Sequence, residues 1–306
     1  MLYLKNMEKL GMEKKNRHCK NNYVRYQISL IGIAIIFILV FGLWGGQKKI
    51  NKTVSIFSWY YELMDVLQFE KYSKILEELK ITRVYQIMSA DLLRDPKLYF
   101  MIENLNKLGI ETALLTGDKS WVEDGLGEYE QIVDAVEIYN ENVKEEFRIK
   151  SIALDVEVHA LPGFWDNPEI MFLKYIDVMK KAKEYAALHE LKVIQVIPVS
   201  FDEIDKGLFE KFVLECCDEL SVMNYDRRYA KEAISYEVDF CRQHEIPVET
   251  IFETMPISRE HQVTGFLTYY YDGIEMLQSD FGQLREIYGK ELGIAYHHFS
   301  TVIDLK

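Results

Sequence analysis

One strand-like segment carries the most chemically useful combination of side chains in the chain. Along Lys150–His159 the residues alternate, so that Asp155, Glu157 and His159 share one face while aliphatic side chains take the other. Two carboxyls on one face of a strand lie about 7 Å apart at Cα, and their repulsion raises the pKa of one of them, as a general acid near neutral pH requires. The alternative is an ordinary strand end whose carboxyls are solvated or paired with Lys or Arg.

The rest of the chain alternates strand-like and helix-like segments. The predicted strands are Val54–Trp59, Ile81–Met88, Ile110–Thr116, Lys150–His159, Leu191–Val199, Glu219–Tyr225, Val248–Thr254 and Gly293–Phe299. The predicted helices are Glu62–Leu79, Pro96–Leu108, Tyr129–Glu146, Pro168–His189, Lys206–Glu215, Ala230–Gln243 and Phe266–Tyr288. This rhythm predicts an α/β fold, a parallel (β/α)8 TIM barrel in which the first and last strands pair. A doubly wound open sheet is the alternative, but the first strand is not followed by the glycine-rich turn that such a sheet uses for phosphate.

The N-terminal part of the chain predicts a membrane anchor. Ile28–Trp44 contains no charged side chain and is just long enough to cross about 30 Å of hydrocarbon as a helix. Basic residues are more numerous before it than after it, which favours a cytoplasmic N-terminus. We therefore expect a basic cytoplasmic tail (1–27), a transmembrane anchor (28–45), a linker (46–52) and an extracytoplasmic barrel (53–306). A cleaved signal peptide is the alternative, which the long basic start makes the weaker one.

Charge and cysteine usage exclude several classes of protein. The first 50 residues hold nine Lys and Arg against two Asp and Glu, which leaves 27 basic and 47 acidic residues, a net charge of −20, on the remainder. Such a body repels nucleic acid, so we expect no nucleic-acid partner. No cysteine spacing fits a zinc site, and the adjacent His297 and His298 should point to opposite faces of a strand. We expect neither a metal nor a cofactor, and a metal-dependent phosphodiesterase remains a minor alternative.

In a TIM barrel the site is built at the carboxyl ends of the strands. The polar and aromatic residues predicted there are Trp59, Tyr60, Glu62, Ser89, Asp91, Asp118, Trp121, Asp155, Glu157, His159, Ser200, Asp202, Asn224, Tyr225, Asp226, Glu253, His297 and His298. Carboxylates and flat rings together are typical of a sugar site. Of these residues we expect Trp59, Trp121, Asn224 and His298 to contact the substrate. The opposite strand ends, which include Glu111 and Glu249, are predicted to form an ordinary charged rim.

Two of these segments resemble a known family. Leu154-Asp-Val-Glu157 and Met223-Asn-Tyr-Asp226 resemble the two hallmark motifs of family 18 glycoside hydrolases, the chitinase-like barrels. The resemblance implies that Glu157 protonates the glycosidic oxygen and that Asp155 orients the substrate's N-acetyl group, which acts as the nucleophile. It also implies that Tyr225 and Asp226 hold that acyl group, and that the partner is a carbohydrate polymer.

The chain departs from the family pattern at several positions. Lys150 and Ala153 stand where the full motif has aspartates, and Tyr296-His-His298 replaces the usual tryptophan of the eighth strand. A second glycosidase arrangement places the acid at Glu157 and a nucleophile at Glu253 on the seventh strand. The sequence therefore predicts a membrane-anchored glycoside hydrolase-like protein acting on a cell-envelope or secreted polysaccharide. The alternative is a catalytically inactive barrel that binds glycan or takes part in polysaccharide assembly.

Overall fold

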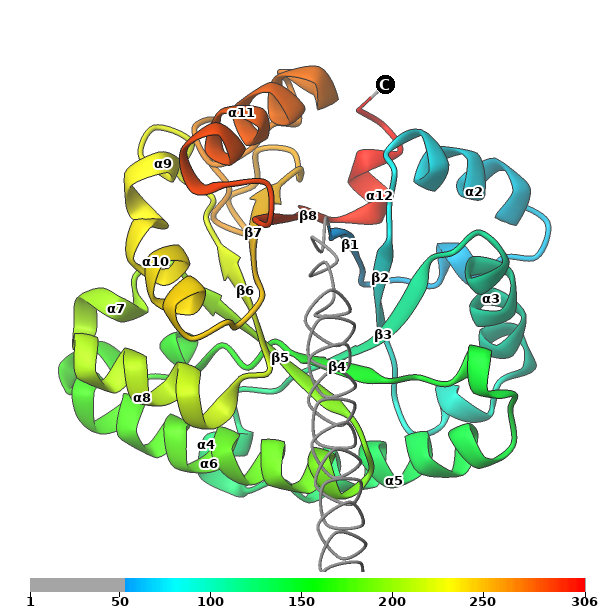
Figure 1. Ribbon diagram of the computed structural model, residues 1–306, viewed down its shortest axis with the longest axis horizontal. Coiled ribbons are helices and arrows are strands. Elements are labelled where there is room, and N and C mark those ends of the chain that lie inside the picture. The colour runs from blue at the N-terminus through cyan, green and yellow to red at the C-terminus, as the bar shows by residue number, and fades with distance from the viewer. Residues whose placement is uncertain (1–52, 306) are drawn as a thin grey trace, which may run out of the picture. The chain divides into compact units, whose positions relative to one another are not determined.

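The structure, a computed structural model, describes residues 53–305, which form an eight-stranded barrel (Figure 1). The strands are β1 (Val54–Ser58), β2 (Arg83–Ile87), β3 (Glu111–Thr116), β4 (Ser151–Leu154), β5 (Lys192–Pro198), β6 (Glu219–Met223), β7 (Val248–Glu253) and β8 (Gly293–His297). They follow one another around the barrel in chain order, and every neighbouring pair is parallel. β1 and β8 pair through Val54 with Ile294 and Ile56 with Tyr296. The predicted TIM barrel and its closure are confirmed.

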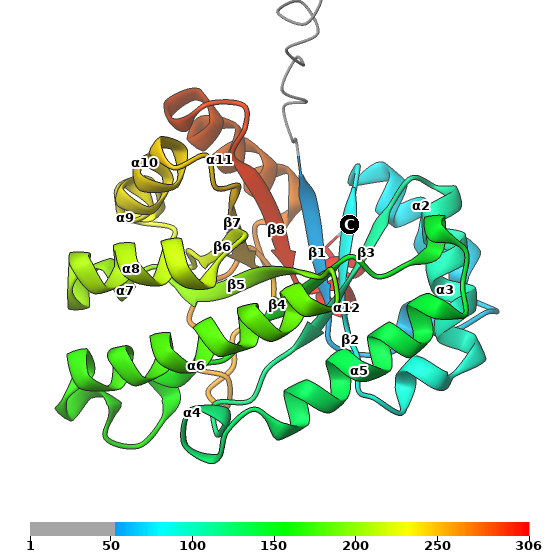
Figure 2. The same ribbon diagram turned by 60° about the horizontal axis from the view of Figure 1, so that its bottom comes forward.

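Helices surround the barrel, as Figures 1 and 2 show. They are α2 (Phe69–Glu78), α3 (Pro96–Lys107), α4 (Trp121–Asp124), α5 (Gly127–Glu141), α6 (Pro168–Leu188), α7 (Phe201–Ile204), α8 (Lys206–Cys216), α9 (Ala230–Ala233), α10 (Ser235–Gln243), α11 (Gly273–Tyr288) and α12 (Phe299–Val302). Short 3-10 turns are η1 (Glu62–Met64), η2 (Leu92–Arg94), η3 (Glu145–Phe147), η4 (Val158–Ala160) and η5 (Phe164–Asp166). All seven predicted helices are present.

Three of the predicted helices are interrupted. The segment predicted as Ala230–Gln243 divides at Ile234 into α9 and α10. The segment predicted as Glu62–Leu79 divides into η1 and α2, because the Asp65 side chain accepts a hydrogen bond from the Leu67 amide and forms a turn between them. The segment predicted as Tyr129–Glu146 ends at Glu141 and continues as η3. The segment predicted as Phe266–Tyr288 becomes helical only from Gly273, where α11 begins, whereas α3, α6 and α8 begin at their predicted residues. α3 begins with Pro96 behind the Asp95 cap, whose carboxylate accepts from the Lys97 amide.

Apolar side chains fill the barrel as well as the layer between strands and helices. The interior set is Phe57, Tyr85, Ala113, Leu115, Ala153, Ile194, Val196, Ile251 and Ala295. Large rings from β1 and β2 are combined with alanines from β3, β4 and β8, which lets one layer close without a channel. The alternate residues of the same strands pack under the helices. The alternation that predicted two faces for each strand is therefore real, and it sets which residues reach the end of the barrel.

The amino-terminal end of the barrel is closed by a buried polar network. Glu249, only 5% exposed, accepts hydrogen bonds from Ser55, Tyr85 and Ser221. Burial raises the pKa of this carboxyl, while the positive charge of Arg83 opposes the rise. The prediction that Glu249 belongs to an exposed charged rim is wrong, because its position in the alternation points it into the barrel. These contacts close the end of the barrel opposite the expected site.

Within residues 53–305, no helix is long and apolar enough to cross a membrane. The predicted anchor, Ile28–Trp44, lies outside the described residues.

Candidate functional site

The carboxyl ends of the strands form a ring that we call the mouth. β4, the strand that leads into Asp155 and Glu157, ends at Leu154, earlier than predicted. The amide of Asp155 still donates to the carbonyl of Thr116 on β3 (2.9 Å), but the Val158 amide then turns back to the carbonyl of Val156. Asp155 therefore keeps its inward direction. The prediction that the strand continues to His159 is wrong, since η4 begins at Val158.

Glu157 consequently lies on a loop rather than on a strand pleat. Half of its side chain is exposed, and its carboxylate lies 3.9 Å from the imidazole of His159. The prediction that Glu157 projects from the strand, one pleat beyond Asp155, is wrong in its geometry, although both side chains stay at the mouth. Glu157 combines solvent access with proximity to Asp155, whose pKa responds to its charge.

A glycine positions Asp155. A Cβ added to Gly117, which follows β3, would stand 2.1 Å from the carbonyl oxygen of Asp155. No side chain fits in that space, so only glycine allows the two chain segments to approach so closely. Together with the hydrogen bond from the Asp155 amide to the Thr116 carbonyl, this close approach supports the Asp155 backbone.

Burial changes the proton affinity of Asp155. Its Oδ1 is buried and has no hydrogen-bond partner among the described residues. The pKa of Asp155 is raised to about 7, mainly by burial and also by the negative charge of Glu157, while His297 opposes the rise. The carboxyl is thus close to half protonated at neutral pH. Asp155 is thus a carboxyl whose pKa burial brings close to neutral pH, directly beside the solvent-accessible Glu157.

A hydrogen-bonded chain links β1, β8 and β7 at the mouth. The indole Nε1 of Trp59 lies 2.9 Å from Nε2 of His297, and Nδ1 of His297 lies 3.0 Å from Oε2 of Glu253. The other carboxylate oxygen of Glu253 accepts from the backbone amides of Thr254 (2.8 Å) and Met255 (2.7 Å). Both oxygens of Glu253 are therefore occupied, which disfavours the second glycosidase arrangement with Glu253 as nucleophile.

Tyr225 completes the mouth from β6. Its partly exposed ring packs on the interior layer, with its centroid 6.0 Å from that of His297. Burial raises the pKa of Tyr225 well above its ordinary value, and the negative charges of Glu253, Asp155 and Glu157 add to the rise. The phenol is therefore protonated across the physiological range and can donate a hydrogen bond. The side chains that point into the mouth are those of Trp59, Asp155, Tyr225, Glu253 and His297.

Two predicted substrate-binding residues are buried away from the mouth. Trp121 is 3% exposed, lies with its ring tilted against that of Tyr129 in the helical layer, and donates its indole N–H to Glu128. Asn224 is 1% exposed and donates its side-chain amide to the carbonyl of Ala230. Trp121 follows β3 within a helix, α4, that packs against the barrel, and Asn224 has the outward place in the alternation. Both residues were predicted to contact substrate, and the structure places neither side chain at the mouth.

Two further predicted residues are engaged locally. Asp226 accepts from its neighbour Arg228 through both carboxylate oxygens, which lowers its pKa. His298 is 6% exposed and accepts or donates through Nδ1 with Ser300 at the start of α12, and burial lowers its pKa to about 4. Neither side chain is free to bind substrate in this structure. The inward histidine is His297, which the alternation from Gly293 through Ala295 identifies and which our selection of His298 missed.

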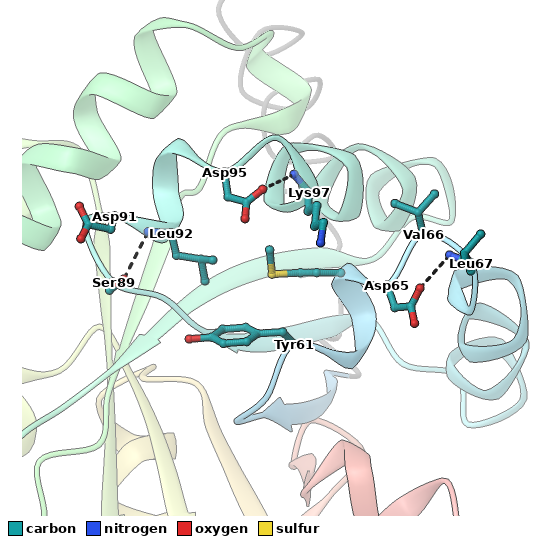
Figure 3. Close-up of a pocket in the computed structure, with 10 residues that line it drawn as sticks. Tyr61, Asp65, Val66, Leu67, Ser89, Asp91, Leu92, Asp95 and Lys97 are labelled. Atoms are coloured by element: carbon teal, nitrogen blue, oxygen red, sulfur yellow. Dashed lines mark hydrogen bonds between the residues drawn. The ribbon is translucent and has the colours of Figure 1, made fainter.

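An open groove of about 790 Å³ lies beside the mouth, between the connections that follow β1 and β2 (Figure 3). It is lined by Tyr61, Met64, Asp65, Val66, Leu67, Ser89, Asp91, Leu92, Asp95 and Lys97. Its lining combines an exposed ring (Tyr61, 56% exposed) and apolar side chains with carboxylates that already cap local turns. Sequence reasoning missed this groove, because it forms only when two loops are brought together.

No metal site is evident in the described part of the chain. Across residues 53–305, no group of three or more His, Cys, Asp and Glu side chains could hold a metal ion. Both ring nitrogens of His297 are used by Trp59 and Glu253. Cys216, Cys217 and Cys241 are free thiols buried in the core.

The described residues form a closed parallel TIM barrel with carboxyls, a tyrosine and a tryptophan at its mouth. The fold is that of the family 18 chitinases, and comparison with solved structures finds it in two of them. A chitinase from Chromobacterium violaceum ATCC 12472 is 11% identical, with a TM-score of 0.51 over 83% of this chain and 98% of that one. A GH18 chitinase from Pseudoalteromonas aurantia is 9% identical, with a TM-score of 0.52 over 82% and 96%.

The same fold relates the chain to other glycoside hydrolases. A calcium-binding mutant of β-glucuronidase 2 from Bacteroides uniformis is 10% identical, with a TM-score of 0.52, and the match spans 80% of this chain but only 30% of that longer one. No protein-family model and no curated protein matches the sequence. The likeness is therefore one of fold, and the chemistry of the site has to be argued from the residues of this chain.

Proposed function

We propose that the protein is a glycoside hydrolase that acts on a cell-envelope or secreted polysaccharide, with Glu157 as the proton donor. The observation that carries the proposal is the pair of carboxyls at the mouth. Asp155 is half-buried with a pKa of about 7, and Glu157 beside it is half exposed. Such a pair can hold one proton at neutral pH next to a solvent-accessible oxygen, which is what protonation of a leaving glycosidic oxygen requires.

The proposed mechanism assigns a separate task to each carboxyl. Glu157 donates its proton to the glycosidic oxygen and becomes a carboxylate. Asp155 then takes up a proton from water, which its raised pKa allows, so that the two adjacent carboxyls do not both stay charged. The phenol of Tyr225 donates a hydrogen bond to the acyl oxygen of an N-acetylated sugar, whose carbonyl serves as the nucleophile in the arrangement that the motifs resemble. The ring of Trp59 provides a flat surface for the sugar.

The groove beside the mouth supports a polymeric substrate. A sugar chain longer than the mouth would reach the connections that follow β1 and β2, where Tyr61 offers an exposed ring and Asp65 and Asp91 offer carboxylate oxygens. We also propose that Ile28–Trp44 anchors the barrel in the cytoplasmic membrane with the barrel outside. Protease added to intact cells should then digest the barrel and spare the N-terminal tail.

A catalytically inactive glycan-binding or polysaccharide-assembly barrel is the second candidate. It is favoured by the engagement of Asp226 by Arg228, since the family's acyl clamp uses an aspartate at that place. An inactive barrel would also be expected to lock Glu157 to a neighbouring arginine. Arg227 instead pairs with Asp272 and Arg228 with Asp226, and Glu157 has His159 at 3.9 Å. This pattern favours the enzyme.

The test compares Glu157→Gln with Glu77→Gln, a matched change on the exposed face of α2. Both variants and the parent are assayed against N-acetylated and plain oligosaccharides and polymers. We expect Glu157→Gln to lower turnover by about 100-fold or more while glycan binding and thermal stability stay near the parent values, because glutamine keeps the shape but gives up no proton. Glu77→Gln should behave as the parent. An active Glu157→Gln variant would overturn the assignment, and glycan binding without cleavage by the parent would favour the inactive barrel.

A further inference from the structure

The hydrogen-bonded chain from Trp59 through His297 to Glu253 leaves little freedom in where its protons lie. An indole N–H can only donate, so Nε2 of His297 must accept from Trp59 at 2.9 Å and carries no proton. Nδ1 must then bear the ring proton and donate it to Oε2 of Glu253 at 3.0 Å. The two contacts together select one tautomer of the imidazole as long as both persist.

Two backbone amides hold the Glu253 end of this hydrogen-bonded chain. Oε1 of Glu253 receives the amides of Thr254 and Met255 at 2.8 and 2.7 Å, so the carboxylate cannot rotate without losing both bonds. Glu253 is 4% exposed and His297 is 18% exposed at its side chain, whereas Trp59 is open enough to touch solvent. The hydrogen-bonded chain therefore extends from the rigid, buried carboxylate of Glu253 to the solvent-accessible ring of Trp59.

We propose that Glu253 and His297 are positioning residues that set the tautomer of His297 and thereby hold the indole of Trp59 in place as a sugar-binding surface of the mouth. The ring comes from β1 and is held by β8 and β7, three strands that meet only through closure of the barrel. Trp59 is steadied on its other side by Phe57, at 6.4 Å between centroids and 17° between planes. The ligand role of Trp59 rests on the proposed function, but the tautomer and its effect on the indole do not.

Glu253→Gln tests this reasoning sharply. The two backbone amides at Oε1 must keep an acceptor, so the glutamine oxygen stays there and its NH2 group faces Nδ1 of His297. Nδ1 then has to accept, Nε2 takes the proton, and an N–H points at the N–H of Trp59. The substitution changes no shape, yet it converts the Trp59–His297 hydrogen bond into a contact between two donors.

The experiment uses the full chain labelled with ¹⁵N-tryptophan, which has four indole N–H signals, one for each tryptophan. Trp59→Phe identifies the signal of Trp59. We expect a hydrogen-bonded position in the parent and in Glu77→Gln, and a shift to the free-indole position in Glu253→Gln. With an N-acetylated oligosaccharide that the parent cleaves, Glu253→Gln and Trp59→Phe should each raise KM by about fivefold and leave kcat within about twofold. The double variant should have the same KM as Trp59→Phe alone.

Several outcomes would overturn the inference. An unmoved Trp59 signal in Glu253→Gln shows that the tautomer is not set by Glu253. If the effects of Glu253→Gln and Trp59→Phe on KM are fully additive, Glu253 does not act through Trp59. If Glu253→Gln lowers kcat by about 100-fold or more, both in the parent and in Trp59→Phe, Glu253 is the nucleophile instead. If the protein cleaves no glycan, the proposed function fails while the indole signal still decides the tautomer.

Discussion

Asp155→Asn should stabilise the protein at alkaline pH, because it removes a charge that the mouth accommodates poorly. The carboxyl is half-buried, one of its oxygens is buried and unpartnered among the described residues, and Glu157 is nearby. Asparagine has almost the same shape and stays neutral at every pH. The gain should therefore depend on pH, and its direction follows from the pKa of Asp155 in the folded and unfolded chain.

The magnitude can be worked from that pKa. Asp155 ionises near 3.8 in an unfolded chain and at about 7 in the folded protein. Below pH 3.8 both states are protonated and the group costs nothing. As the pH rises toward 7 only the unfolded state loses its proton, so stability falls by about 1.4 kcal/mol per pH unit, to a limit of about 4 kcal/mol for a fully enclosed group. Because part of the side chain reaches solvent, we expect a limit of about 2 kcal/mol, with roughly a third of it lost by pH 5.

The assay is urea unfolding of the full-length protein at pH 5 and pH 8, followed by tryptophan fluorescence. Asp155→Asn should exceed the parent by more at pH 8 than at pH 5, with a difference between the two gains of about 1 kcal/mol or more. Asp177→Asn, on the exposed side of α6, is the matched control and should show no such difference. Equal gains at both pH values, or a less stable Asp155→Asn at pH 8, would refute the electrostatic reasoning. Turnover should fall in Asp155→Asn even where its stability rises.

Three other results are expected. Gly117→Ala should destabilise the fold by about 2 kcal/mol and lower activity, since its methyl group would stand 2.1 Å from the Asp155 carbonyl oxygen; a variant as stable and active as the parent would contradict that contact. Glu237, fully buried on α10 with both oxygens unpartnered among the described residues, has its pKa raised to about 8 by burial. The free-energy cost of burying this carboxyl grows from about pH 4.5 up to pH 8, because only the unfolded chain releases the proton in that range. The advantage of Glu237→Gln over the parent in thermal stability should therefore increase from pH 5 to pH 9, and an advantage independent of pH would contradict this reasoning. Tyr61→Ala should raise KM for long glycans more than for short ones, which a comparison of chain lengths will decide.

The side-chain alternation along each strand was readable from the sequence. Because successive residues of a strand point to opposite faces, the inward direction of Asp155, Tyr225, Glu253 and His297 followed once the strands were identified. The same rule, applied strictly, places Asn224 and His298 outward, and choosing them as substrate-binding residues ignored it. The closed eight-stranded barrel was likewise predictable, since eight strand-like segments separated by helices have few other ways to bury both faces of a parallel sheet.

What the sequence could not predict depends on contacts between distant residues. β4 stops at Leu154 because the chain turns back on itself after Asp155, and Trp121 is buried because α4 packs into the helical layer. The bond between Trp59 and His297 joins residues 238 positions apart. Periodicity reports only on neighbours a few residues away, whereas the partners of a side chain and its burial arise when the barrel closes. Contacts between strands therefore decided that Glu253 supports an imidazole and that the pKa of Asp155 lies near neutral pH.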